Sequence, residues 1–277
     1  MNDYLLQIAT LAAMSCLLAL GAYATLSAGL LFMCFGTIMS IGGIVAAAVY
    51  SSGLPFLVAL GAGGAAGACA GGLIYIGCSR LIGFLFAVAT LSFGELARVI
   101  ALNTERFGGA LGYKDVRASP SICYPFALMG IAIICLGIFD KCPMRLALRI
   151  IKEDEVNAAS LGINIGLHRL AAVVSGSFVV ALAGGLYIHA VGLLEPRMFG
   201  FDNSLEILIF AIVGGTATYV GPICGAVLLT ALPELLRFST SLRMLFYGAV
   251  LVVIIIFRPE GIIGSRFGQS RGQTVIR

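Results

Sequence analysis

Charged side chains are scarce in this sequence. Asp, Glu, Lys and Arg make up 11% of its 277 residues, whereas they make up roughly 25% of an ordinary soluble domain. Hydrophobic residues account for 60%, and the mean hydropathy is +1.06. This composition excludes a typical soluble domain and predicts an integral membrane protein.

The N-terminal part of the chain lacks basic residues, the first of which is Arg80. A secretory signal starts with a positively charged region and continues with a short hydrophobic run. Residues 4–26 are instead hydrophobic almost throughout, and they are long enough to cross a membrane as a helix. We therefore expect them to be a retained first span.

Groupings typical of metal sites and catalytic sites are missing from the sequence. The eight cysteines occur singly, without a Cys-x-x-Cys pair, and most lie in hydrophobic runs where a thiol packs as a small hydrophobe. His168 and His189 have no second ligand at helical spacing. No Ser/His/Asp set or pair of acids appears. We expect no metal site and no enzymatic activity, and the dispersed basic residues do not indicate nucleic-acid binding.

Hydrophobic stretches of about 20 residues recur along the chain, and each can cross lipid as a helix because a helix satisfies its own backbone hydrogen bonds. The continuous stretches are 4–26, 28–50, 54–77, 82–102, 122–140, 169–192 and 241–257, and an interrupted one runs from 204 to 236. The sequence thus predicts an all-α integral membrane protein. We expect a polytopic helical bundle of about 8 apolar segments, one of them broken or re-entrant, in a single domain over residues 1–277.

Basic residues predict the orientation of the loops. They border residues 141–168 and follow the last hydrophobic stretch, so both regions are expected on the cytoplasmic side. The loop 103–121 is then external. An even number of crossings between the two cytoplasmic regions requires 204–236 to enter the membrane and return. Counting backwards places the N-terminus outside.

Two glycine patterns differ in what they predict. Gly63, Gly67 and Gly71 recur every four residues, a spacing that lets helix backbones approach closely in lipid. The run GGTATYVGP at 214–222 combines glycine and proline, which frees backbone groups that need protein or water as partners. This run is a candidate part of a transport pathway, and simple packing is the alternative.

Acidic residues within hydrophobic stretches need a physical explanation. An unpaired carboxylate at mid-membrane costs about 3 kcal/mol. Glu95 has Arg98 three residues further on, so the two share a helix face and can pair. A structural pair and a role in transport both remain open for Glu95. Glu206 lies near the outer end of its segment and is interpreted as interfacial.

The stretch IKEDEVNAASLGIN, residues 151–164, concentrates charge in an otherwise hydrophobic chain. Pro143 suits the first turn of a helix, and Gly162 suits a C-terminal stop. We therefore expect one helix over residues 143–161 near the cytoplasmic surface, with Asn164 capping the next span.

The same helix is expected to have an apolar face formed by Leu146, Ile150, Ala158 and Leu161, next to a polar patch at 152–155. Small residues after this patch would leave a shallow surface. A solvated loop helix and a docking element for a partner protein both remain open.

Seven segments resemble the permease subunits of branched-chain (hydrophobic) amino acid ABC importers and follow the order of that family. They are GLPFLVAL, FAVATLSFGELARVIAL, NTERFGGALG, EDEVNAASLGINIGLHRLAAVVSGSFVVALAGGLYIHAVG, PRMFGFDNSLEILIFAIVGG, TATYVGPICGAVLLTALPELLR and FRPEGIIG. Together they cover most of residues 53–264. The chain departs from the family pattern at Phe35, near the place of a histidine, at Ala217, in place of a glycine, and at Asn157, in place of an alanine.

The resemblance implies that residues 151–164 contain a coupling helix that seats in a cleft of a cytoplasmic ATPase. The residues assigned to ATPase coupling are Glu153, Asp154, Glu155, Asn157, Ala158, Gly162 and Asn164. The chain has no G-x-x-x-x-G-K-[ST] nucleotide loop, so ATP and Mg are expected on separate ATPase subunits and no cofactor on this chain. Further implied partners are a second permease chain, a related paralogue, an external substrate-binding protein, the amino-acid substrate and membrane lipid.

The expected function is inward movement of branched-chain or related hydrophobic amino acids by alternating access, in a bacterial-type inner membrane with the C-terminus cytoplasmic. The candidate pathway residues are Gly42, Gly43, Glu95, Gly214, Gly215, Thr216, Thr218, Gly221 and Pro222. A urea or short-amide ABC permease is an alternative within the family. A proton-coupled secondary transporter is an alternative from another class, with Glu95 as its titrating acid.

Overall fold

Nearly all of the described chain is helical. The computed structural model describes residues 2–81, 83–104, 109, 112–113, 123–235, 248, 252 and 261–262. Its elements are α1 (Asn2–Leu26), α2 (Phe35–Ser51), α3 (Phe56–Cys78), α4 (Phe84–Asn103), α5 (Cys123–Phe139), α6 (Pro143–Glu153), α7 (Glu155–Ser160), α8 (Ile165–Val191), the 3-10 helix η3 (Pro196–Phe199), α9 (Phe201–Gly214) and α10 (Val220–Leu235). The all-α prediction is confirmed. Most of the expected span 241–257 and most of the loop 103–121 lie outside the described residues.

Four of the described helices, α1, α3, α4 and α8, are long and apolar enough to cross a membrane. They correspond to the expected spans at 4–26, 54–77, 82–102 and 169–192. Helices α2 and α10 are apolar but shorter, and α5 meets the criterion only together with α6, from which it is bent by 73°. The protein is therefore a polytopic helical membrane protein.

Helix α2 begins later than the sequence indicated. The expected span started at residue 28, but residues 27–34 form a turn and an extended segment. Gly29 has a φ of 73°, which glycine adopts at little cost and which ends α1. Side chains replace the missing helical hydrogen bonds: the Met33 N–H donates to Thr90 Oγ1 at 3.1 Å. The expectation of a helix before Phe35 was therefore wrong.

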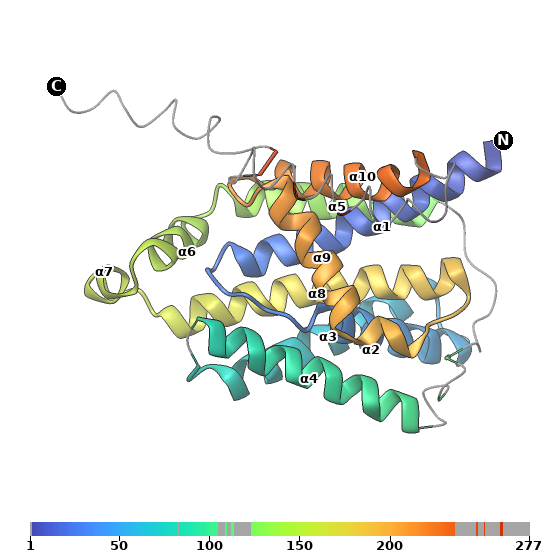
Figure 1. Cartoon of the computed structure of the whole chain (residues 1–277), viewed down its shortest axis with the longest axis horizontal. Coiled ribbons are helices and arrows are strands. Elements are labelled where there is room, and N and C mark those ends of the chain that lie inside the picture. The colour runs from blue at the N-terminus through green and yellow to red at the C-terminus, as the bar shows by residue number, and fades with distance from the viewer. Residues whose placement is uncertain are drawn as a thin grey trace.

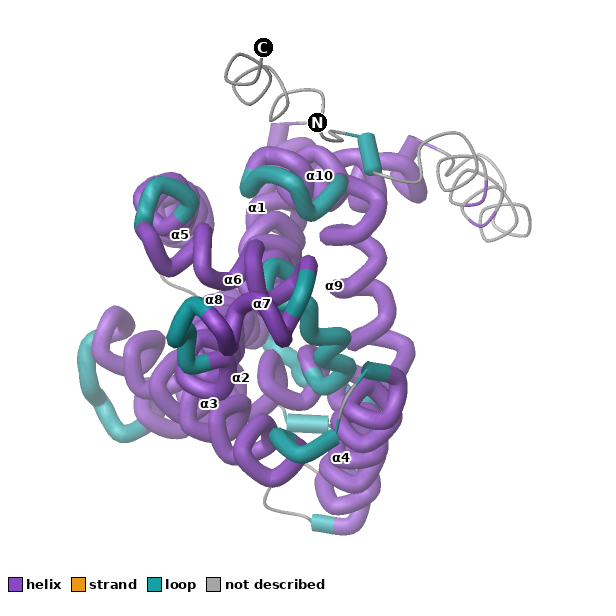
Figure 2. The backbone as a smooth tube through the Cα atoms, turned by 90° about the vertical axis from the view of Figure 1, so that its left-hand side faces the viewer, coloured by secondary structure: helices purple, strands orange, loops and turns teal. Residues whose placement is uncertain are grey.

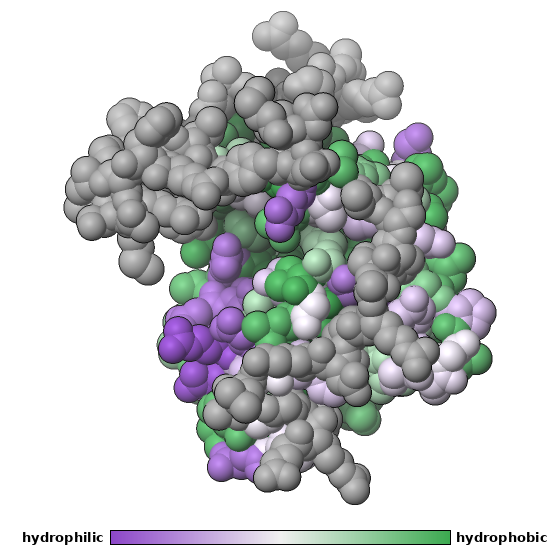
Figure 3. Space-filling model, turned by 90° about the vertical axis from the view of Figure 1, so that its right-hand side faces the viewer, coloured by the Kyte–Doolittle hydropathy of each residue, from purple (hydrophilic) through white to green (hydrophobic). Residues whose placement is uncertain are grey.

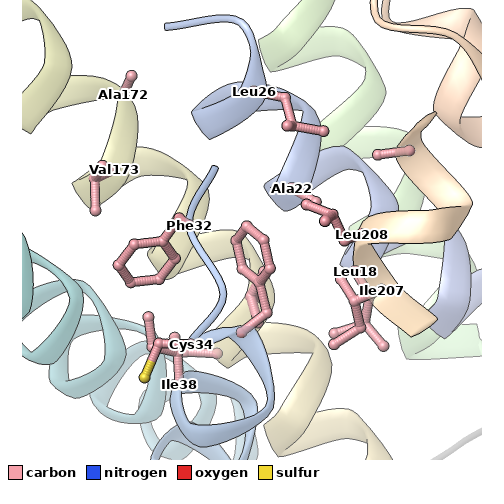
Figure 4. Packing of buried hydrophobic residues seen from close by; sticks show 14 of the residues in the cluster. Leu18, Ala22, Leu26, Phe32, Cys34, Ile38, Ala172, Val173, Ile207 and Leu208 are labelled. Carbon is pink, nitrogen blue, oxygen red and sulfur yellow. The ribbon is translucent and has the colours of Figure 1, made fainter. Parts of the chain in front are cut away.

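The extended segment forms the middle of the hydrophobic core. Phe32 and Cys34 are fully buried there, between residues of α8 such as Val173 and residues of α1 and α9 such as Leu18 and Ile207 (Figure 4). The rings of Phe32 and Phe35 meet edge to face, with centroids 5.3 Å apart.

Helix α8 is the central element, since α1, α2 and α3 all pack on it (Figure 1). Small residues make this packing close. A Cβ on Gly67 would meet Ala181, and one on Gly71 would meet Ser177, so two glycines of the α3 repeat face α8 directly. The predicted close packing of the glycine repeat is confirmed. In lipid, such contacts supply van der Waals attraction where the hydrophobic effect between helices is weak.

Two other regions differ from the central bundle. Helix α5 lies apart from α9 and α10, with its main contact on α1 (Figure 2). The broken segment expected at 204–236 consists of the packed helices α9 and α10, with a connecting turn over residues 215–219. This turn lies toward the same end of the molecule as α6 and α7 (Figures 1 and 2).

Gly184 provides a test of the close packing along α8. A Cβ at this position would meet the Met39 carbonyl of α2, whereas a Cβ on Gly61 of α3 would meet nothing within 4 Å. We expect Gly184→Ala to destabilise the protein by about 1–3 kcal/mol through overpacking, and Gly61→Ala to leave stability unchanged or slightly raised. Thermal unfolding in detergent measures both. Equal melting temperatures for the two variants would contradict the packing.

Candidate functional site

The charged stretch at 151–164 forms two helices rather than the single helix expected over 143–161. The break is at Asp154, whose backbone is extended with φ −156° and ψ 113°. Its carboxylate accepts hydrogen bonds from the Val156 N–H at 2.8 Å and the Asn157 N–H at 3.2 Å. Asp154 is thus an N-cap, a position that aspartate favours because it satisfies the free N–H groups of a first turn. The single-helix expectation was wrong.

The predicted signals at the end of this stretch are confirmed. Gly162 has a φ of 75° and follows α7. The Asn164 side chain accepts a hydrogen bond from the Leu167 N–H at 3.2 Å and caps α8. Asn157 Nδ2 also donates to the Asp154 carboxylate at 2.7 Å. The shape of the segment therefore depends on four of the assigned residues: Asp154, Asn157, Gly162 and Asn164.

The expected apolar face of this segment was wrong as well. Leu148, Ile151 and Ala158 are buried, whereas Leu146 and Leu161 are 62% and 68% exposed. The break at Asp154 turns α7 relative to α6, so a helical spacing counted through it does not describe one face. Val156 is 75% exposed and lies with Leu161 on the outer surface of the segment.

An ion pair anchors α7 to the bundle. The Arg169 guanidinium of α8 forms an ion pair with the Glu155 carboxylate at 2.6 Å. The Nε of Arg169 donates a hydrogen bond to the Ala28 carbonyl at 3.4 Å. The Arg169 side chain is 15% exposed and that of Glu155 is 43% exposed. Buried Ala158 adds an apolar contact. A displacement of α7 would therefore act on α8 and on the α1–α2 connection.

Arg145 ties α6 to three other parts of the chain. Its guanidinium pairs with Asp140 at the end of α5 at 3.3 Å and lies 5.0 Å from the centre of the Tyr23 ring in α1. The Tyr23 hydroxyl donates to Asp140 at 2.8 Å. The guanidinium also donates to the Thr216 and Ala217 carbonyls, both at 3.4 Å. It thus satisfies backbone groups that the α9–α10 turn leaves open.

A cavity of about 400 Å³ lies between α6 and this turn, and it is basic. It is lined by Arg145, Arg149 and Lys152 of α6, together with Ser27, Glu153, Thr216 and Ala217. The Lys152 ammonium lies 3.5 Å from the Thr216 hydroxyl. Partial burial, and then the Arg145 and Arg149 charges, lower the pKa of Lys152. The structure therefore brings Glu153 together with Thr216, two residues that the sequence analysis assigned to separate sites.

Sequence reasoning overlooked the basic residues of this contact. Their signal was nevertheless present, because Arg145, Arg149 and Lys152 follow one another at i, i+4 and i+7. This spacing places them on one helix face. What the sequence could not reveal is that this face meets the α9–α10 turn.

Three of the other candidate pathway residues lie away from this turn. Gly42 and Gly43 are buried in α2, where Cβ atoms would meet the backbone of Ala181 and Gly184 in α8. Glu95 pairs with Arg98 at 2.8 Å, as predicted, and also accepts a hydrogen bond from the Phe201 N–H at 2.8 Å. The carboxylate therefore connects α4 to the start of α9.

Close backbone contacts define the α9–α10 turn. A Cβ on Gly214 would meet the Gly221 carbonyl, next to Pro222 in α10. Gly215 has a φ of 100°, a conformation that side chains disfavour. The Gly221 N–H donates to the Thr218 carbonyl at 3.2 Å. The glycines thus allow the two helices to meet at the turn.

The anchoring of α7 can be tested by hydrogen exchange. Replacing Glu155 by Ala removes the pair with Arg169, a partly exposed interaction that contributes about 0.5–1 kcal/mol. We expect amides of residues 155–163 to exchange about two- to fivefold faster. Glu153→Ala is the control, because Glu153 is exposed and forms no ion pair among the described residues. Unchanged exchange in the Glu155 variant would exclude the anchor.

Comparisons with known proteins agree on one family. The family model described as "Branched-chain amino acid transport system / permease component" matches residues 4–255. The chain is 28% identical to the high-affinity branched-chain amino acid transport system permease protein LivM of Salmonella typhimurium, over 96% of this chain and 73% of that protein. It is also 28% identical to LivM of Escherichia coli strain K12, over 92% of this chain and 69% of that protein. No solved structure matches the chain.

The matched region includes every described helix except the first residues of α1. It contains the α6–α7 segment, the α9–α10 turn and the contacts between them. Because the family model covers most of its length, this chain belongs to the family of permease components of branched-chain amino acid transport systems.

Proposed function

We propose that this chain is the transmembrane subunit of an ATP-driven importer for branched-chain or related hydrophobic amino acids. The observation that carries the proposal is the match of residues 4–255 to the permease family. The substrate moves by alternating access and undergoes no covalent chemistry. Because the sequence has no nucleotide-binding loop, ATP and Mg bind to separate ATPase subunits.

The α6–α7 segment is the docking element for the ATPase. Its exposed Leu146, Val156 and Leu161 support this role, because large exposed hydrophobic side chains on a segment outside the lipid favour contact with a protein partner. The roles of the seven assigned residues differ accordingly, and one of them, Glu153, lines the basic cavity beside α6. Asp154, Asn157, Gly162 and Asn164 give the segment its shape, while Glu155 and Ala158 attach it to the bundle.

ATP-driven movement reaches the membrane part of the chain through two sets of contacts. One is the Glu155–Arg169 pair at the start of α8, and the other is the bonding of Arg145 to the α9–α10 turn. A partner can shift a conformational equilibrium only by binding one state more tightly than the other. Through these two sets of contacts, the position of the docking surface depends on the conformation of the membrane helices. A docked ATPase can therefore bind one conformation more tightly than the other.

The α6–α7 segment and the C-terminus lie on the cytoplasmic side of the inner membrane. Basic residues around both regions favour this orientation. The Ile262 N–H, beyond the expected last span, donates to the Val213 carbonyl next to the α9–α10 turn at 2.9 Å. Tyr113, from the expected external loop, pairs instead with Leu194 beyond the other end of α8.

A related second permease chain and an external substrate-binding protein complete the importer. Helices α3 and α4 carry many exposed hydrophobic side chains, including Leu57, Leu73, Phe84 and Leu85. These surfaces suit membrane lipid, which offers no hydrogen bonds, or an apolar face of the second chain.

Placing a charge on the docking surface tests the coupling. Val156→Asp should reduce ATP-driven leucine uptake by about tenfold or more in proteoliposomes that contain the whole importer, because the partner would bury an unpaired carboxylate. Membrane insertion of the chain should be unchanged. Ser79→Asp, an exposed position after α3 at the same end of the molecule, is the matched control.

Uptake in the Val156 variant at the level of the Ser79 control would remove the docking assignment.

A proton ionophore distinguishes an ATP-driven importer from a proton-coupled transporter in the same assay. Uptake should persist with the ionophore while ATP is held constant, and its collapse would favour a proton-coupled mechanism.

A further inference from the structure

A second cavity lies away from the α6–α7 segment, between the first half of α1, the start of α2, the end of α8 and α9. Its volume is about 250 Å³, close to the lower end of the ~300–1,000 Å³ of small-molecule sites. Most of its wall is hydrophobic, formed by Leu11, Met14, Met39, Met198, Ile207 and Phe210. On the face where α8 ends, hydrophobic residues are interspersed with hydrophilic ones (Figure 3).

Two hydrogen-bond acceptors from α9 line this cavity. Asn203 and Glu206 are three residues apart, so they lie on one helix face. Asn203 Nδ2 donates to the Met198 carbonyl at 3.0 Å, and this bond fixes the side-chain amide with Oδ1 as its remaining acceptor. The cavity wall therefore includes a side-chain amide and a carboxylate on the same face of α9.

The Glu206 carboxylate forms no hydrogen bond or ion pair within the part of the chain that the structure describes. Glu95 differs, because it has both Arg98 and the Phe201 N–H as partners. Glu206 is exposed where it borders the cavity, so its carboxylate can be reached by a ligand that enters there. A carboxylate without a partner in the protein favours a ligand with a positive charge.

We propose that this cavity is a binding site for a zwitterionic amino acid with a hydrophobic side chain, with the ammonium group at Glu206 and Asn203. This assignment rests on the proposed transport function and adds to it a location for the substrate within this chain. The hydroxyls of Ser15 and Tyr187 also line the cavity and supply donors for the substrate carboxylate.

The hydrophobic wall determines which side chains fit. Three of its residues are methionines, whose flexible thioethers adapt to side chains of differing shape. Such a wall accepts leucine, isoleucine and valine alike and excludes charged side chains, which it would leave without partners. Tyr187, near the end of α8, lines the cavity, and α8 ends at the side of the molecule opposite α6 and α7 (Figure 1). This is the external side in the proposed orientation, so substrate released outside can enter the cavity.

Direct binding tests the site without the ATPase. Tritiated leucine is titrated onto the full purified chain in lipid nanodiscs. We expect Glu206→Gln to weaken binding about 10- to 100-fold, because a charge-assisted hydrogen bond is lost. Asp202→Asn is the matched control, an exposed acid on the same helix that does not line the cavity, and it should bind as the wild type does.

Competition on the wild-type chain keeps the test informative if the Glu206 variant does not fold. Isoleucine and valine should displace leucine, whereas 4-methyl-2-oxopentanoate, which has the leucine side chain but no ammonium group, should not. Equal competition by this keto acid would overturn the proposal. Wild-type affinity in Glu206→Gln, or no leucine binding by the wild type, would also overturn it.

Uptake by the whole importer separates this site from the proposed function. ATP-driven leucine uptake with unchanged kinetics in Glu206→Gln would overturn the site and leave the function standing. Glu206-dependent leucine binding without ATP-driven uptake by the wild-type importer would support the site and contradict the function.

Discussion

Close backbone contact along α8 is the constraint on which the rest of the structure depends. In lipid, helices gain little from the hydrophobic effect when they meet, so van der Waals contact must hold them together. Small residues on α2, α3 and α8 allow this contact, as at Gly67 against Ala181. Close packing therefore fixes the position of α8, and with it the positions of Arg169 near its start and Tyr187 near its other end.

The two ends of α8 have different chemistry. At its start, Arg169 holds α7, and Arg145 of α6 holds the α9–α10 turn. Near its other end, Tyr187 faces the cavity that contains Glu206 of α9. Helix α9 thus runs from the proposed substrate site to the turn held by α6. If α6 moves and displaces this turn through their hydrogen bonds, the position of α9 and the shape of the cavity will change.

The hydrophobic pattern was sufficient to predict the helical class, the four long spans and the broken segment, because lipid permits few alternatives for the backbone. The caps at Gly162 and Asn164 were also predictable, since each depends on local chemistry. The start of α2 and the break at Asp154 were not predicted. The start of α2 depends on a bond between residues distant in sequence, from the Met33 N–H to Thr90. The break at Asp154 depends on a local cap, and the aspartate that forms it was present in the sequence but was not recognised as an N-cap. Glu206 was interpreted as interfacial from its place near the outer end of its segment. The cavity that it lines was not predicted, because its neighbours on α1 and α8 are distant in sequence.

The central claim is that ATP-driven force enters through α6 and α7 and moves the α9–α10 turn. Electron paramagnetic resonance can measure it directly, with nitroxide labels at the exposed positions Val220, at the start of α10, and Ser79, at the end of α3. Within the assembled importer, the distance between the labels should change when ATP is bound and hydrolysis is blocked, and this change should vanish in Val156→Asp. An identical distance distribution with and without ATP in the wild-type importer would contradict the account.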